Sequence, residues 1–131
     1  MAQFESNIAE KTTERTTRFV CISDTHDCYD FVLPDGEILL HAGDFTNNGT
    51  EDEIERFLNW LKTLKQYRLK IFIVGNHESK RFYTKKRYKK FAAIIEQIKS
   101  DKSLQLNDGI VYLEDKSFYD PISGLNFYGR Y

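Results

Sequence analysis

The chain of 131 residues is poor in cysteine and proline, with two of each. So few prolines, combined with 40% hydrophobic and 15% aromatic residues, argue against disorder away from the chain ends. Cys21 lies inside an apolar run and Cys28 in the loop after it, which suits neither a structural disulfide nor a thiolate zinc site. We therefore predict that both cysteines are reduced thiols.

The sequence also lacks an excess of charge of one sign and any long apolar run. Nineteen basic residues face twenty acidic ones, so no global field attracts nucleic acid or an anionic membrane. No stretch approaches the roughly 18 consecutive apolar residues of a membrane helix, and the N-terminus lacks the pattern of a secretory signal. We expect a cytoplasmic protein with no membrane partner and no nucleic-acid partner.

The domain organisation predicted from the sequence is simple. Residues Met1–Thr17 are polar, rich in threonine and without periodicity, and we predict a flexible leader there. Residues 18–131 have the size of one ordinary domain. They show no internal repeat, which excludes a solenoid.

The alternation of strand-like and helix-like segments indicates the fold class. Apolar runs predict buried strands at Phe19–Ile22, Ile38–Leu40 and Lys70–Val74. After a capping box, apolar residues at helical spacing predict a helix over Glu51–Gln66, and a second amphipathic helix is predicted over Lys85–Lys99. We predict an α/β fold with a mostly parallel sheet, whose functional residues gather at the carboxyl ends of the strands.

The C-terminal segment contains two more apolar runs, Ile110–Leu113 and Leu125–Tyr128. They are separated by turn-forming residues at Asp120-Pro121 and Ser123-Gly124. We predict a strand followed by a hairpin-like return strand.

Polar side chains that bind metals follow each of the first three predicted strands. Asp24 and His26 follow the first, Asp44 follows the second, and Asn76 and His77 follow the third. Each cluster alone is a weak signal, because such residues are common in loops and turns. Their shared position after successive strands is far more specific, and mixed carboxylate, imidazole and amide donors suit ions such as Mn, Fe or Mg.

These donors predict a metal-dependent phosphoester hydrolase. Two cations roughly 3.5–4 Å apart orient a phosphoryl group and neutralise charge that develops during in-line attack. We predict that Asp24, His26, Asp44 and Asn76 bind metal. His77 is then the catalytic residue, which donates to the phosphoryl oxygen or to the leaving group. Either Asp24 or Glu78 would orient its ring.

Three sequence blocks resemble the first three signature blocks of the calcineurin-like metallophosphoesterase superfamily, and of its metallophosphoesterase-domain subgroup in particular. The blocks are Phe19-Val20-Cys21-Ile22-Ser23-Asp24-Thr25-His26, His41-Ala42-Gly43-Asp44-Phe45-Thr46 and Gly75-Asn76-His77-Glu78. The resemblance implies a β-sandwich flanked by helices, of which this chain would supply the mostly parallel half. It also implies two divalent ions (Mn, Fe, Mg, Ni or Zn) and a small-molecule phosphoester substrate, such as a cyclic nucleotide or a related phosphodiester. The same metal ligands follow from it, with Asp44 as the bridge.

The sequence departs from the family pattern in its later part. The Gly-His and Gly-His-x-His blocks that bring three further metal-binding histidines are absent, and only three histidines occur in the chain. We therefore expect an incomplete metal centre and a weakly active or inactive phosphodiesterase-like protein. The alternative is a truncated, non-catalytic relative with a binding or regulatory role.

Two features are left over from this interpretation. His41, at the end of the second strand, is interpreted as a buried imidazole that hydrogen-bonds a neighbour and is not a metal ligand. The run Lys80–Lys90 holds seven basic residues, which we interpret chiefly as a solvated helix face, with local phosphate binding as the alternative. Half a sandwich would also leave a sheet edge uncovered, through which the chain could self-associate.

Overall fold

A four-stranded, fully parallel sheet forms the centre of the protein in a computed structural model that describes residues 14–79 and 84–130. The strands β1 (Phe19–Ile22), β2 (Ile38–His41), β3 (Leu69–Phe72) and β4 (Ile110–Tyr112) lie in the order β1-β2-β3-β4. The predicted α/β class and parallel sheet are confirmed. All four carboxyl ends therefore point to the same edge.

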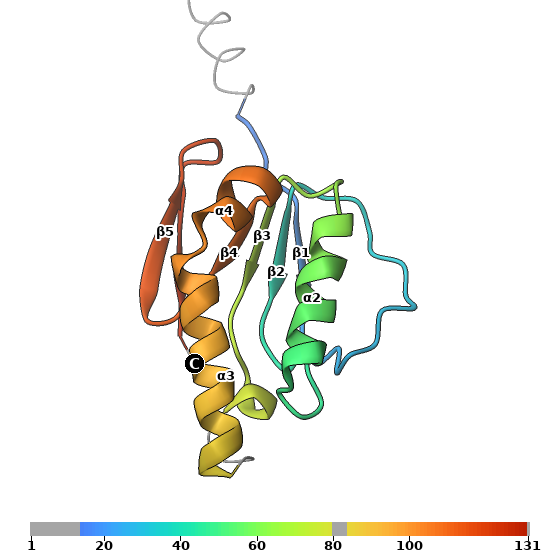
Figure 1. Ribbon diagram of the computed structural model, residues 1–131. Coiled ribbons are helices and arrows are strands. Elements are labelled where there is room, and N and C mark those ends of the chain that lie inside the picture. Colours follow the sequence, from blue (N-terminus) through green and yellow to red (C-terminus); the bar gives the residue numbers. More distant parts are fainter. Residues whose placement is uncertain (1–13, 80–83, 131) are drawn as a thin grey trace, which may run out of the picture.

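Two helices, α2 (Glu51–Thr63) and α3 (Lys85–Ser100), cover one face of this sheet (Figure 1). Alternate strand residues face them, because successive side chains of a strand point to opposite sides. The largest core cluster lies between these layers and includes Val20, Leu39, Phe45, Ile54, Phe57, Leu61, Phe72, Phe91, Ile95, Ile98 and Ile110. The rings of Phe45 and Phe57 stack at its centre with a centroid distance of 4.0 Å.

The start of α2 agrees with the predicted capping box, but its end does not agree with the predicted Gln66. Thr50 accepts a hydrogen bond from the backbone N–H of Glu53, whose side chain accepts in return from the backbone N–H of Thr50. The helix ends at Thr63, since Leu64 turns its N–H onto the carbonyl of Leu61. Leu64 still packs on the core from the turn, which is why the apolar pattern runs past the helix end.

A short helix, α4 (Lys102–Asp108), was not predicted from the sequence. Leu104 is its one buried residue, so it has no apolar stripe that a periodicity could reveal. Gly109 ends the helix with a φ of 62°, a left-handed conformation that glycine adopts without strain. The helix α3 begins at Lys85 as predicted and ends one residue later than predicted, at Ser100.

The C-terminal prediction was only partly right. The run at Ile110–Leu113 does form a strand, but that strand is β4 of the parallel sheet. The hairpin consists instead of β5 (Lys116–Asp120) and β6 (Leu125–Gly129), which pair antiparallel in a separate two-stranded sheet. It packs against the sheet face opposite the helices, in a second cluster that includes Ile38, Leu69, Ile71, Val111, Leu113, Phe118 and Phe127. This small second layer is consistent with part of a sandwich.

Two predicted features lie partly outside the described residues. Most of the predicted leader is residues 1–13, and part of the basic run is residues 80–83. Within the described end of the leader, Arg15 donates to the carbonyl of Ile122 and to Glu37. In the described part of the chain, no helix is both long and apolar enough to cross a membrane.

Candidate functional site

The loops that follow β1, β2 and β3 meet at the carboxyl edge of the sheet. Three backbone hydrogen bonds join the first two loops: Asp24 N–H to the Gly43 carbonyl, His26 N–H to the Asp44 carbonyl, and Asp27 N–H to the Phe45 carbonyl. Their N···O distances are 3.0, 3.1 and 2.9 Å. The loop after β2 thus supports the loop after β1 almost as a neighbouring strand would.

The second and third loops approach each other so closely that only glycine fits. Gly43 has a φ of 98°, and a Cβ atom there would lie 2.6 Å from the backbone nitrogen of Gly75. A Cβ atom on Gly75 would in turn collide with the side chain and backbone nitrogen of Asp44. The two glycines therefore let Asp44 lie directly against the turn that carries Asn76 and His77.

Strained backbone conformations concentrate in the same loops. Asp24, His26, Asp27 and Asp44 all have positive φ, between 44° and 61°. Such conformations cost free energy in residues other than glycine, and proteins keep them mainly where function requires a particular side-chain direction.

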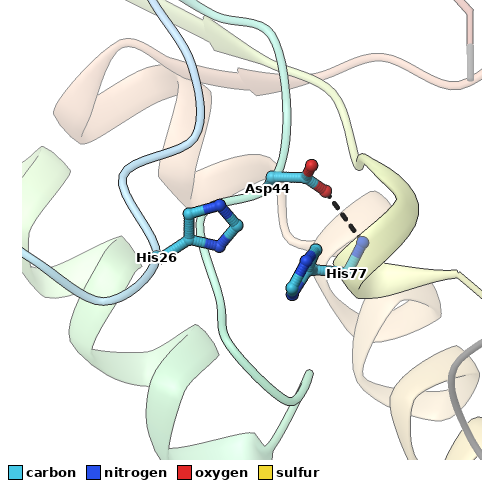
Figure 2. A group of neighbouring side chains, drawn as sticks. All are labelled: His26, Asp44 and His77. Atoms are coloured by element: carbon cyan, nitrogen blue, oxygen red, sulfur yellow. Dashed lines mark hydrogen bonds between the residues drawn. The ribbon is translucent and has the colours of Figure 1, made fainter.

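Three of the predicted site residues come together. His26, Asp44 and His77 each offer one ligand atom, and these atoms lie within 4.8 Å of one another. Figure 2 shows the three side chains, which come from the loop after β1, the loop after β2 and the 3₁₀ helix η1 (Asn76–Glu78). The imidazole rings of His26 and His77 lie edge to face, with centroids 4.5 Å apart.

Backbone carbonyls fix the tautomers of both histidines. Nδ1–H of His26 donates to the carbonyl of Thr46, and Nδ1–H of His77 donates to the carbonyl of Asn47, each at 3.0 Å. A carbonyl can only accept, so in each neutral ring Nε2 carries the lone pair. Metal-binding histidines typically have this arrangement, with one ring nitrogen held by a carbonyl or carboxylate and the other on the ion.

Asp44 is the buried acid of the group, with 9% of its surface exposed. Its Oδ1 atom accepts a hydrogen bond from the backbone N–H of His77 at 2.8 Å (Figure 2). Asp24 is more open, and its Oδ1 atom lies 3.9 Å from Nε2 of His26. Its other oxygen accepts from the hydroxyl of Ser23. Asp24 thus lies beside His26, but it is not one of the three residues whose ligand atoms all lie within 4.8 Å of one another.

Asn76 is exposed and begins η1 directly after β3. Its backbone carbonyl accepts hydrogen bonds from the N–H and the hydroxyl of Ser79. These bonds fix the turn, and they do not involve the side-chain amide of Asn76.

His41 is buried at the base of the site, with 2% of its surface exposed. Its Nδ1 atom accepts from the backbone N–H of Gly43, so Nε2–H donates to the hydroxyl of Thr25 at 2.9 Å. Burial lowers the pKa of His41 to about 4, although the carboxylates of Asp24 and Asp44 act in the opposite direction. The burial and the two hydrogen bonds agree with the sequence interpretation of His41 as a packed imidazole that hydrogen-bonds a neighbour.

Two buried glutamates contribute to the site in a way that the sequence did not reveal. Glu78, one of the two acids that we considered for orienting His77, accepts hydrogen bonds from backbone N–H groups of Asp44, Thr46 and Gly75. Glu53 accepts in the same way from the residues Asn47, Asn48 and Thr50. Only the capping box of Glu53 gave a sequence signal, because hydrogen bonds to backbone groups leave no pattern of residue types.

The donor set fits a divalent ion. Two ligand atoms that each lie roughly 2.0–2.2 Å from one ion are at most about 4.4 Å apart. The ligand atoms of His26, Asp44 and His77 lie within 4.8 Å of one another, so a shift of about half an ångström or less closes the group on an ion. Imidazole nitrogen with carboxylate oxygen suits Mn, Fe, Zn or Ni and does not select among them.

Comparison with known proteins agrees with this geometry. The chain is 36% identical over 119 residues to UPF0046 protein K07C11.7 of Caenorhabditis elegans, a match that covers 86% of the chain and 38% of that protein. It is 52% identical over 63 residues to metallophosphoesterase domain-containing protein 1 of Homo sapiens, which covers 47% of the chain and 19% of the human protein. A segment of 77 residues is 47% identical to the probable rhamnogalacturonate lyase C of Emericella nidulans and covers 59% of the chain but 7% of that protein.

The chain thus spans less than half the length of each of these relatives. The sequence profile of the calcineurin-like phosphoesterase family matches residues 17–130, which include all three loops at the carboxyl edge of the sheet. With this match and the loop geometry in agreement, the chain belongs to the calcineurin-like phosphoesterase family.

Proposed function

We propose that the carboxyl edge of the sheet is the metal centre of a phosphoester hydrolase of the phosphodiesterase type. The observation that carries the proposal is the convergence of His26, Asp44 and His77 from three separate loops onto one point. Family membership supports the same chemistry. Small phosphodiesters, including cyclic nucleotides, are the proposed substrates.

In this proposal Asp24, His26, Asp44 and Asn76 hold the metal, with Asp44 positioned to bridge two ions. Divalent ions at such a centre neutralise the phosphoryl charge and supply the activated nucleophile. The protein contributes directed donors: the Thr46 carbonyl aims His26, and the His77 backbone N–H holds one oxygen of Asp44.

His77 is the proposed catalytic residue. Its Nδ1–H is held by the Asn47 carbonyl, so Nε2 is the atom that exchanges a proton with the substrate. When protonated, Nε2–H donates to the departing oxygen, and the fixed Nδ1 contact keeps the ring from turning away.

A second candidate function, binding of an ion without turnover, is favoured by the number of donors. The chain has three histidines, of which His41 is buried with both ring nitrogens engaged and His77 is the proposed proton donor, so His26 is the one imidazole assigned to the metal. A second ion would then depend on Asp44 and Asn76, which are few strong ligands. Without turnover, the family site would act in binding or regulation.

Hydrolysis of bis(p-nitrophenyl) phosphate with and without Mn²⁺ tests the proposal. We expect slow turnover that requires the metal and that Asp44→Asn abolishes. Asp35→Asn is the matched control, because Asp35 is an exposed acid in the loop that precedes β2, at the opposite edge of the sheet. Turnover that survives Asp44→Asn, or that needs no metal, contradicts the proposed centre.

The melting temperature separates the two candidate functions. Metal that binds the native state raises the melting temperature by an amount that grows with the metal concentration relative to the dissociation constant, whether or not the chain is active. A rise with Mn²⁺ but no turnover of bis(p-nitrophenyl) phosphate or 3′,5′-cyclic AMP supports the binding function. Parallel titrations with Mg, Zn, Ni and Fe identify the preferred ion.

A further inference from the structure

The carboxylate of Glu78 is buried beneath the site, with 1% of the residue exposed. Its Oε2 atom accepts hydrogen bonds from the backbone N–H groups of Asp44 and Gly75, at 2.9 and 2.8 Å. Its Oε1 atom accepts from the backbone N–H and the hydroxyl of Thr46, at 2.8 and 2.7 Å. Each oxygen thus accepts two hydrogen bonds, and all of the donors belong to the loops of the site.

These bonds link the loop after β2 to the loop after β3. Gly75 lies in the loop after β3 and Asp44 in the loop after β2, yet both N–H groups point at the same oxygen atom of Glu78. Asp44 has a φ of 56°, so the direction of its side chain depends on a backbone conformation that is costly in isolation. The carboxylate of Glu78 compensates part of that cost through charge-assisted hydrogen bonds.

The same carboxylate also acts on His26. Thr46 donates two hydrogen bonds to Glu78, and its carbonyl accepts the Nδ1–H of His26. The two bonds to Glu78 therefore hold Thr46 in place, and the carbonyl of Thr46 sets the direction of the imidazole. Asp44 and His26 are both proposed metal ligands, and both depend on one buried side chain that touches neither ligand group.

We propose that Glu78 is a positioning residue that holds the Asp44 carboxylate and the His26 imidazole at metal-binding distance. The inference rests on the proposed metal centre and adds to it the residue that sets its geometry. Glu78 acts through the backbone of Asp44 and Thr46, so its removal lowers the affinity for metal even where the fold persists.

The isosteric amide cannot replace this carboxylate. A glutamine has one acceptor oxygen and one NH₂ group, which only donates. In one orientation the NH₂ group would face the backbone N–H groups of Asp44 and Gly75, and in the other it would face the N–H and the hydroxyl of Thr46, of which only the hydroxyl can turn to accept. Glu78→Gln therefore keeps the volume of the side chain but breaks at least one hydrogen bond and opposes an N–H donor to the NH₂ group.

Isothermal titration of the whole chain with Mn²⁺ tests the inference. We expect Glu78→Gln to raise the dissociation constant by about tenfold or more, the scale typical of residues that orient metal ligands. Asp120→Asn is the matched control, because Asp120 is also buried and accepts from Arg68, just before β3, and from Ser123, at the edge of the sheet opposite the site. It should lose comparable stability and keep its Mn²⁺ affinity within about threefold.

The outcomes separate this inference from the proposed function. If the unsubstituted chain binds no Mn²⁺, the metal centre is wrong and the role of Glu78 falls with it. If the unsubstituted chain binds Mn²⁺ and Glu78→Gln binds it equally tightly, or Asp120→Asn weakens it as much, the positioning role alone is overturned.

A second variant covers the case in which Glu78→Gln does not fold. Thr46→Val removes the hydroxyl that donates to Glu78 and accepts from the N–H of Gly49, and it keeps the branched shape of a fully buried residue. We expect it to weaken Mn²⁺ binding by roughly threefold, less than Glu78→Gln, because the backbone N–H of Thr46 still donates to Glu78. Unchanged affinity in a folded Thr46→Val variant would overturn the inference.

Discussion

The direction of one hydrogen bond separates the histidines of the site into two kinds. In His26 and His77, Nδ1–H donates to a backbone carbonyl, so Nε2 carries the lone pair. In His41 the order is reversed, because Nδ1 accepts from the N–H of Gly43 and Nε2–H donates to Thr25. Both nitrogens of His41 are engaged within the protein, so its place beside the site gives it a structural role and no ligand role.

The buried His41 makes stability depend on pH. Its pKa in the folded protein is about 4, against 6.5 for an unperturbed histidine. Above pH 6.5 both states are neutral and the full stability is present. As the pH falls from 6.5 toward 4, the unfolded chain takes up a proton that the folded chain does not, and stability is lost. The loss is on the order of 3 kcal/mol by pH 4.

Urea unfolding in EDTA between pH 7.5 and pH 4 measures this loss, with His41→Gln for comparison. Glutamine can accept from Gly43 and donate to Thr25, so the variant should be less stable at neutral pH but should fall less steeply in acid. Both proteins carry the same carboxylates, so the difference between their curves of stability against pH isolates the contribution of His41. Parallel curves would show that His41 does not titrate as described.

At the scale of elements, the sequence predicted what periodicity and caps encode. The start of α2 followed from the capping box, and β1 followed from its continuous apolar run. The helix α4 and the strand β5 were missed because each buries few apolar side chains, and β5 alternates only weakly between exposed and buried. The partner of β6 could not be predicted either, because pairing depends on contacts distant in sequence.

For the site, the sequence predicted the location but not the backbone contacts that support it. Metal-binding residue types at three successive strand ends indicated where Asp44, His26 and His77 would meet, because parallel strands share one carboxyl edge. The sequence could not show that the carbonyls of Thr46 and Asn47 orient the rings, since any residue supplies a carbonyl. It could not distinguish Glu78 as an acceptor of backbone N–H groups for the same reason.

The packing of α2 on the sheet is tested by substitution of Phe57. Its ring stacks on Phe45 at 4.0 Å and lies 5.2 Å from Phe72, with none of its surface exposed. Phe57→Ala should lower the free energy of unfolding by about 3–5 kcal/mol, through lost burial and the cavity left behind. Urea unfolding measures the loss. The exposed Glu55→Ala on the same helix should change it by about 0.5 kcal/mol or less, and equal effects would contradict the packing.

At the scale of the whole molecule, the sheet is covered unequally on its two faces. The helices α2 and α3 cover one face along its length, and the small β5–β6 hairpin covers part of the other (Figure 1). The hairpin is held by apolar contacts of Phe118 and Phe127 and by a bidentate ion pair. Arg68, just before β3, donates to both oxygens of Asp120 at the hairpin turn, at 3.0 and 2.8 Å.

The Arg68–Asp120 pair should couple the hairpin to the sheet. Asp120 is 3% exposed, and the hydrogen bonds from Arg68, followed by those from Ser123, hold the pKa of its carboxyl below the usual 3.8. Arg68→Met leaves that carboxylate buried without its main partner. We expect a loss of about 2 kcal/mol at pH 7, less than for a fully buried pair because Arg68 is partly exposed. Folding lowers the pKa of Asp120, so the carboxylate stabilises the protein fully above pH 3.8 and loses this effect gradually as the pH falls from 3.8 toward the lower pKa of the folded state. The difference between Arg68→Met and the unsubstituted chain should therefore begin to shrink below pH 3.8. Lys65→Met, which breaks the exposed pair of Lys65 with Asp108, should cost about 0.5 kcal/mol or less at any pH.

Amide hydrogen exchange then decides whether the loss of stability in Arg68→Met is local. Faster exchange confined to β5 and β6 supports the coupling of the hairpin to the sheet, and exchange that rises equally in β1 to β4 contradicts it.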